Sequence, residues 1–410
     1  MSYKIYLYTL LFAILQASHA WFALDWHPAL QIGISILNLL AFNSINKSKQ
    51  LPKGAWIIII VLMLSPFCGW RVPKHWVLPI FTYIPFITLL LLKDEAKMRI
   101  ARSVYSFFSV TLFLSLVLYF WHGFGLPLLE FPVHRSVGIP YDYPNYFLYI
   151  QLKYSGALAG AFSGYCIEPG YLSLLCVCLL FIAKFDLKDK RTYIFITAII
   201  FSMSLGGYIL MVVGYLMVYF MRRKKNMTKT LFGGAVILLI LYTLFVYISQ
   251  LDNGNNVIAE EILSRLAFDS DKGIVGNNRE NAIAEIIIDK FFYSDSIWFG
   301  IGEEKWVKDA YLQEGFDACS WRIFVVKYGA VYTVLAISLI LLYCKKISNP
   351  DVYIPLLTIY FLDFIQHATL FSESFIFLLL LVSLYKKQTY DSISFIRSKK
   401  SKLCLNNKIV

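Results

Sequence analysis

Glu168 is a carboxylate that stands directly before an apolar stretch of the chain. It lies in the sequence Gly164-Tyr165-Cys166-Ile167-Glu168-Pro169-Gly170, which is followed by the apolar residues 171–183. Ionisable groups beside a membrane-embedded segment are costly and usually mark a pathway or a site. The alternative is that Glu168 caps a helix with Pro169 in its first turn, because an acid favours the positive end of a helix. Both interpretations hold if the helix start directs the carboxylate into a cavity.

Hydroxyl and cationic side chains are expected on the same side of the membrane as Glu168. Ser202 and Ser204 fall at a predicted turn, where they suit a polar, hydroxyl-rich ligand. Arginine suits phosphate because its planar fork pairs with two oxygens at once. Pairing with nearby acidic residues is the alternative role of each arginine. The candidate arginines are Arg135, Arg279 and Arg322.

Other motifs carry less information. Asp317 is a second carboxylate at a helix entrance, where capping is again the alternative. Gly300 and Gly302 would let the backbone approach a ligand closely, although an ordinary loop turn explains them more simply. Asp269 and Asp271 have a spacing that holds metal in soluble sugar-nucleotide transferases, but such pairs are common in polar loops. The histidines show no metal-ligand spacing and no phosphate-cradling loop stands out, so we predict no metal and no cofactor.

The elements that must position these residues are membrane-spanning helices. Of the 410 residues, 58% are hydrophobic, and they form runs too long for a soluble core. These runs approach the length that crosses ~30 Å of hydrocarbon, and no cleavable signal peptide is evident. The sequence therefore predicts an all-α, multi-pass membrane protein. The apolar runs are 5–24, 29–45, 55–70, 76–92, 104–121, 171–183, 193–220, 231–248, 324–344, 352–365 and 375–385.

The basic residues follow alternate runs. One set of connections, together with both termini, holds 26 of the 38 basic residues and 6 of the 26 acidic ones. This is the positive-inside pattern, so both termini are predicted to lie in the cytoplasm. The formal net charge of +12 therefore orients helices and contacts anionic lipid, and it does not indicate a nucleic-acid partner.

The run 193–220 has basic clusters at both ends that must share one side, so it is predicted to turn back. The turn is expected at 202–207, where Gly206 and Gly207 permit a reversal. Each arm would then span roughly 21 Å, less than a bilayer, so the turn should be recessed and line a cavity. Counting this hairpin as two gives twelve spans. A kinked or strongly tilted single helix is the alternative.

The chain divides into six regions, because two predicted outer segments are too long to be simple connections. The later segment holds two amphipathic patterns and should form a small folded cap. The regions are N-terminal transmembrane helices at 1–121, a first outer, periplasmic loop at 122–169, central transmembrane helices at 170–249, a large outer loop at 250–321, C-terminal transmembrane helices at 322–387 and a basic cytoplasmic tail at 388–410.

In their order and membrane placement, these motifs resemble the bacterial O-antigen and capsule repeat-unit polymerases and the related O-antigen ligases. The resemblance rests on Glu168-Pro169-Gly170 at the start of a span and on Ser202-x-Ser204-x-Gly206 at a turn. It also rests on Arg279 followed by Gly300-x-Gly302, and on a late outer loop that leads into a span with Gly329 near its start.

The resemblance implies a glycosyltransferase-C-like enzyme of the bacterial inner membrane. It would transfer a glycan from undecaprenyl pyrophosphate to an acceptor sugar hydroxyl, with the lipid-linked oligosaccharide, membrane lipid and a chain-length regulator protein as partners. The candidate catalytic residues are Arg279, which would stabilise the leaving pyrophosphate, and Glu168 or Asp317, which would accept the hydroxyl proton. Aromatic rings would stack on sugar faces. The residues assigned to substrate binding are Arg135, Arg322, Ser202, Ser204, Tyr143, Tyr146, Trp321, Gly300 and Gly302.

Two alternatives stay open. An O-antigen ligase is less favoured, because ligases carry a histidine in the late outer loop where this chain has Asp317. A flippase for lipid-linked oligosaccharides can also have about twelve spans, but large folded outer loops and the lack of an internal repeat argue against it. Ionisable residues buried within spans would favour transport, and Asp363 is the clear acid inside a run.

Overall fold

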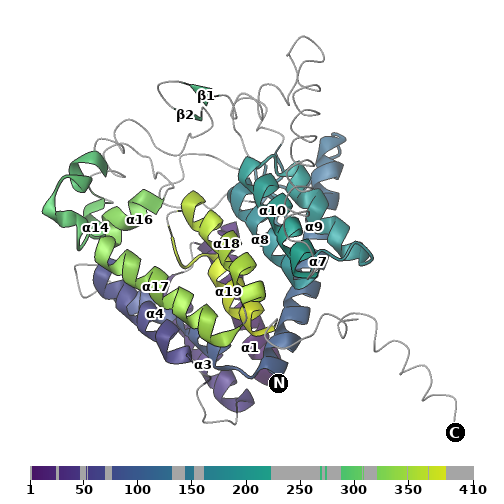
Figure 1. The fold of residues 1–410 in the computed structure, drawn as a ribbon. Helices are drawn as coiled ribbons and strands as arrows, with labels where there is room; N and C mark the ends of the chain where they lie inside the picture. The colour runs from purple at the N-terminus through teal and green to yellow at the C-terminus, as the bar shows by residue number, and fades with distance from the viewer. Residues whose placement is uncertain are drawn as a thin grey trace, which may run out of the picture.

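The computed structural model of the protein is a helical bundle (Figure 1). It describes residues 2–24, 27–46, 52, 54–69, 76–131, 144–151, 161–222, 268–269, 273–274, 288–306, 308, 321–348, 350–367 and 369–384. The helices are α1 (Ser2–Ala17), α2 (Trp21–Leu24), α3 (Pro28–Ile45), α4 (Ala55–Gly69), α5 (Val77–Thr82), α6 (Ile84–Leu91), α7 (Asp94–Gly123), α8 (Pro169–Ile182), α9 (Lys190–Phe201), α10 (Leu205–Arg222), α14 (Glu303–Trp306), α16 (Trp321–Tyr328), α17 (Ala330–Ile347), α18 (Pro350–Gln366) and α19 (Glu373–Leu384). A short 3-10 helix (Asp295–Ile297) and an antiparallel pair of two-residue strands, β1 (Phe268–Asp269) and β2 (Gly273–Ile274), complete the described elements.

Membrane-spanning character is visible in the described helices. Three of them, α3, α7 and α17, are long and apolar enough to cross a membrane, and six further apolar segments are shorter. The surfaces of α3 and α7 expose large apolar side chains that would face lipid. These exposed side chains include Leu37, Leu40, Val110 and Phe113.

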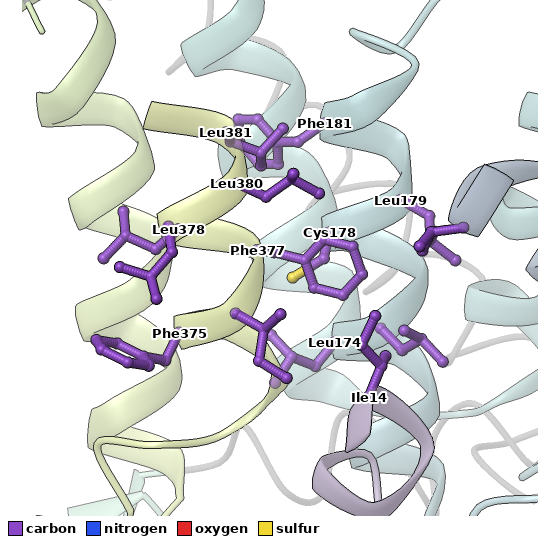
Figure 2. Packing of buried hydrophobic residues seen from close by; sticks show 14 of the residues in the cluster. Ile14, Leu174, Cys178, Leu179, Phe181, Phe375, Phe377, Leu378, Leu380 and Leu381 are labelled. Carbon is purple, nitrogen blue, oxygen red and sulfur yellow. The ribbon is translucent and has the colours of Figure 1, made fainter. Parts of the chain in front are cut away.

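Two helices occupy the centre of the bundle. In α8 every residue from Tyr171 to Phe181 is buried, and in α19 every residue from Glu373 to Val382 is buried. Helices that are apolar on all sides have this central position. Figure 2 shows Leu174 and Cys178 of α8 close to Phe377 of α19, with Ile14 of α1 beside them. The central parts of α8 and α19 are therefore enclosed by neighbouring helices.

The run 193–220 is divided between α9 and α10 at residues 202–204. The reversal does not use glycine, because Met203 itself adopts a φ of +51°. Gly206 and Gly207 belong to the first turn of α10, so assigning the reversal to these glycines was wrong. A Cβ on Gly207 would lie 2.4 Å from the Cβ of Ser173, so glycine is needed there for α10 to pack closely on α8.

Part of the predicted outer loop packs on α16. Backbone hydrogen bonds join this segment to α16 and to the start of α17: the N–H of Ile301 donates to the carbonyl of Val326 at 2.8 Å, and the N–H of Val331 in α17 donates to the carbonyl of Trp298 at 3.1 Å. Gly300 and Gly329 have φ values of +71° and +87° where these segments cross. A small second core lies beside the crossing, formed by Ile288, Phe291, Trp306, Ile323, Val325 and Val326.

A buried polar network joins α1, α3 and α6. The amide of Asn38 donates to Thr9 Oγ1 at 2.8 Å, and the hydroxyl of Thr88 donates to Asn38 Oδ1 at 2.6 Å. All three residues are buried. Such a network fixes which faces of the three helices meet, because a misplaced partner would leave polar groups unsatisfied in an apolar interior.

Replacing Asn38 by alanine should lower the free energy of unfolding by about 1–3 kcal/mol, because Thr9 loses its donor and Thr88 its acceptor. The measurement is the midpoint of thermal unfolding of the purified protein in detergent. Ser44→Ala on the exposed end of α3, where the hydroxyl donates to the carbonyl of Leu40 in the same helix at 3.1 Å, is the matched control. If both variants unfolded at the same midpoint temperature, the hydrogen bonds of Asn38 would not stabilise the packing of α1, α3 and α6.

Candidate functional site

Glu168 occupies the N-cap position of α8, with extended backbone dihedrals and Pro169 as the first helical residue. Its side chain makes no capping hydrogen bond to the helix. The carboxylate therefore stands at the positive end of α8 without being used to cap it. Residues 167–170 are half-buried, whereas the residues on either side of them are buried. The start of α8 is thus a partly accessible point at the end of a central helix.

The turns at the ends of other helices lie close to the start of α8. The N–H of Ile167 donates to the carbonyl of His19 at 3.0 Å, and the N–H of Phe162 donates to that of Phe201 at 2.8 Å. The turn after α1, the segment before α8 and the turn after α9 therefore share one end of the bundle. Phe324 of α16 packs edge-on against Phe364 of α18 at 5.5 Å, which brings α16 toward the same end, the upper end in Figure 1.

Three rings are stacked beside Glu168. The ring of Tyr171 lies 4.0 Å from that of His19 at an angle of 11°, and 4.6 Å from that of His367 at 20°. Tyr171 is thus held between two imidazoles that come from opposite ends of the sequence. The stack fixes the plane of His367.

Asp363 and His367 form a buried pair at the end of α18. Nδ1 of His367 lies 2.5 Å from Oδ1 of Asp363. The other carboxylate oxygen, Oδ2, accepts hydrogen bonds from the hydroxyls of Ser372 at 2.7 Å and Ser374 at 2.5 Å. Glu373 is also fully buried, and neither of its carboxylate oxygens has a hydrogen-bond partner among the described residues. The start of α19 therefore clamps Asp363 in place.

The predicted turn serines are bound to the backbone. Ser202 is fully buried, and its hydroxyl donates to the carbonyl of Ile199 at 2.6 Å. The hydroxyl of Ser204 accepts from the N–H of Gly207 at 3.2 Å, as a cap of α10 does. Both serines stabilise the turn that lies next to the start of α8, and their contact with a ligand stays a prediction.

The remaining described candidates lie in other parts of the structure. Arg322 pairs with Asp289 at 3.3 Å, and Trp321 is exposed at the start of α16. The hydroxyl of Tyr146 lies 3.3 Å from Nε2 of His122. Gly300 and Gly302 approach the chain's own backbone at residues 326–329, so their use against a ligand also stays a prediction. Arg135, Arg279, Tyr143 and Asp317 lie outside the described residues.

Sequence reasoning noticed Asp363 but did not find the group around it. The signal was present in the spacing of Asp363 and His367, since residues four apart on a helix share one face. The serines at 372 and 374 reach Asp363 only because α19 begins close to the end of α18, which the spacing of residues does not show.

Carboxylates, imidazoles and hydroxyls dominate the described part of this group, a composition that suits proton transfer and the binding of a hydroxyl-rich ligand. We define the polar end cluster as Glu168, Tyr171, Asp363, His367, Ser372, Glu373 and Ser374, together with His19. Its members come from four separate segments that lie at one end of the bundle. No protein-family model, no curated protein and no solved structure matches the chain.

Proposed function

We propose that this protein polymerises lipid-linked oligosaccharide repeat units, transferring a glycan from undecaprenyl pyrophosphate to an acceptor sugar hydroxyl. Twelve spans, a glycosyltransferase-C-like fold and a place in the bacterial inner membrane belong to the proposal. The observation that carries it is the polar end cluster, which includes Glu168 and lies beside the turn at 202–204. Transfer between two lipid-linked substrates requires polar groups at the end of a membrane bundle, where the headgroups of both substrates lie.

In the proposed reaction, departure of the pyrophosphate supplies the driving force. Arg279, Arg322 and Arg135 would stabilise the charge that develops on the leaving group, because preorganised cations stabilise such a transition state strongly. A carboxylate, Glu168 or Asp317, would accept the proton of the attacking hydroxyl. The lipid-linked oligosaccharide would enter from the membrane, and a chain-length regulator protein would act on the growing polymer.

A lipid-linked oligosaccharide flippase is the second candidate, and a specific observation favours it. Asp363, His367 and Glu373 are ionisable residues buried in the bundle at the ends of α18 and α19. Buried ionisable groups of this kind mark proton and substrate pathways in transporters. The same residues can support transfer chemistry, so the choice between the two functions needs an experiment.

The glycan pattern of a deletion strain separates the candidates. Loss of the polymerase should leave lipid capped with a single repeat unit, whereas loss of a flippase should accumulate intermediates on the cytoplasmic face. Loss of a ligase should remove surface glycan while long polymer accumulates on its carrier. Reconstitution of the purified protein in vesicles with a defined lipid-linked repeat unit should then yield a ladder of products. A deletion strain with normal long chains would refute the proposed function.

A further inference from the structure

We infer that Nε2 of His367 is the atom that accepts the proton of the acceptor sugar hydroxyl, and that Asp363 is the residue that positions it. This inference rests on the proposed function. It moves the role of proton acceptor from Glu168 to a residue that the sequence alone did not single out.

The hydrogen bonds of His367 prepare it for this role. Its Nδ1 lies 2.5 Å from Asp363, which fixes the imidazole tautomer with the proton on Nδ1 and the lone pair on Nε2. Asp363 cannot rotate away, because its second oxygen holds the hydroxyls of Ser372 and Ser374. Nε2 makes no hydrogen bond to any residue that the structure describes. Asp363 thus holds Nδ1 in place, and the lone pair of Nε2 can accept a proton.

Nε2 is directed at the start of α8. A Cβ at position 170 would lie 3.8 Å from it, so Nε2 faces Gly170, two residues after Glu168. Gly170 is half-buried while His367 is 4% exposed, so the approach to Nε2 passes this glycine. A hydroxyl held by the Glu168 carboxylate at the helix start would lie near Nε2. Glu168 would then bind and orient the acceptor sugar.

The titratable groups around His367 come from each neighbouring element. They are His19 from the turn after α1, Glu168 and Tyr171 from α8, Asp363 from α18 and Glu373 from α19. Three of these five groups are carboxylic acids. The acids disfavour binding of the pyrophosphate beside His367, because like charges repel. The pyrophosphate would instead bind to Arg279, Arg322 and Arg135.

The step balances without a further reagent. The O–H bond of the acceptor breaks and its proton forms a bond to Nε2. The acceptor oxygen uses the freed electron pair to bond the anomeric carbon of the donor glycan. The bond from that carbon to the pyrophosphate oxygen breaks, and its electron pair leaves with undecaprenyl pyrophosphate. The imidazolium then returns its proton to water.

The test uses full-length protein in vesicles with a lipid-linked repeat unit as both donor and acceptor. His367→Gln should lower kcat by about 10²–10⁴-fold with little change in KM, since a general base acts in the transition state. Asp363→Asn should lower kcat in the same direction. Wild-type kcat should fall as the pH is lowered, because a protonated imidazole cannot accept a proton, and this acid limb should be missing from the residual rate of His367→Gln. Added imidazole should partly restore His367→Ala.

Several results would overturn the assignment. His367→Gln with a wild-type rate and pH profile would do so while leaving the proposed function intact, as would a folded His367→Ala protein that imidazole does not restore. A wild-type protein that transfers no glycan would instead reject the proposed function. If the histidine variants fail to fold, Gly170→Leu decides: it should block the approach to Nε2 and lower the rate at least tenfold, whereas Gly33→Leu on the lipid-facing α3 should not. Equal rates for these two would also overturn the assignment.

Discussion

Glu168→Ala should abolish chain extension while the amount of protein in the membrane stays unchanged. The loss of activity is expected because the carboxylate stands at a half-buried helix start and belongs to the polar end cluster. Abundance should hold because the side chain makes no capping hydrogen bond to α8, and the charge–dipole interaction lost at the helix start is about 0.3–1 kcal/mol. Glycan banding in cells reports chain length, and immunoblotting of membranes reports abundance. Arg279→Ala should give the same two results through loss of charge stabilisation on the leaving group.

Glu95→Ala is the matched control for this prediction. Glu95 is likewise an acid at the start of a helix, in the first turn of α7, but it is exposed and its helix begins at the end predicted to be cytoplasmic. Chain length should be normal in this variant. Normal long chains in Glu168→Ala, with equal abundance, would remove Glu168 from the site.

Gly300→Ala and Gly329→Ala should each destabilise the contact between the outer loop and α16. At position 300 a Cβ would lie 2.5 Å from the carbonyl oxygen of Lys327, and at 329 it would lie 2.5 Å from that of Trp298. Both contacts are with backbone, which cannot swing aside as a side chain can. Positive φ adds strain of about 1–3 kcal/mol and overpacking about 1–3 kcal/mol, so a loss of roughly 2–6 kcal/mol is expected. Thermal unfolding and limited proteolysis of the outer loop provide the measurements.

The control for the glycine variants is Gly33→Ala in α3. No atom lies within 4 Å of a Cβ at that position, and its backbone is helical, so alanine should stabilise the helix by about 0.5–1 kcal/mol. If alanine at 300 or 329 left the unfolding midpoint and the proteolysis pattern as they are in Gly33→Ala, the close crossing of the two segments would be wrong.

Hydropathy locates the helices well because each long apolar run must satisfy its backbone within itself. The run 29–45 corresponds to α3 within one residue, and 352–365 lies inside α18. Breaks were harder to anticipate. The run 324–344 is interrupted at Gly329, which has a positive φ. The backbone of Trp298 and Phe299 lies against this glycine, and these residues are too far away in the sequence for the hydropathy of the run to reveal the break.

The candidate site was predictable in part. Glu168 and the turn at 202–204 stand out locally, because a carboxylate and two hydroxyls interrupt apolar sequence. The ring stack of His19, Tyr171 and His367 could not be inferred, since its members are separated by most of the chain. Only tertiary packing shows that Asp363 and His367 end beside the start of α8.

The burial of α8 on all sides has a consequence for biosynthesis. A helix of 14 residues rises about 21 Å, which is short for a bilayer, and its neighbours bury every residue from Tyr171 to Phe181. Helix α19 packs on α8, and the end of α18 places Asp363 and His367 at the start of α8. Both helices follow α8 in the chain by more than 160 residues. Until α18 and α19 have been made, α8 must therefore be held by the translocation machinery or pack temporarily against other helices. The polar end cluster could then assemble only after α18 and α19 have been made, so the protein would acquire its chemistry long after α8 has been synthesised.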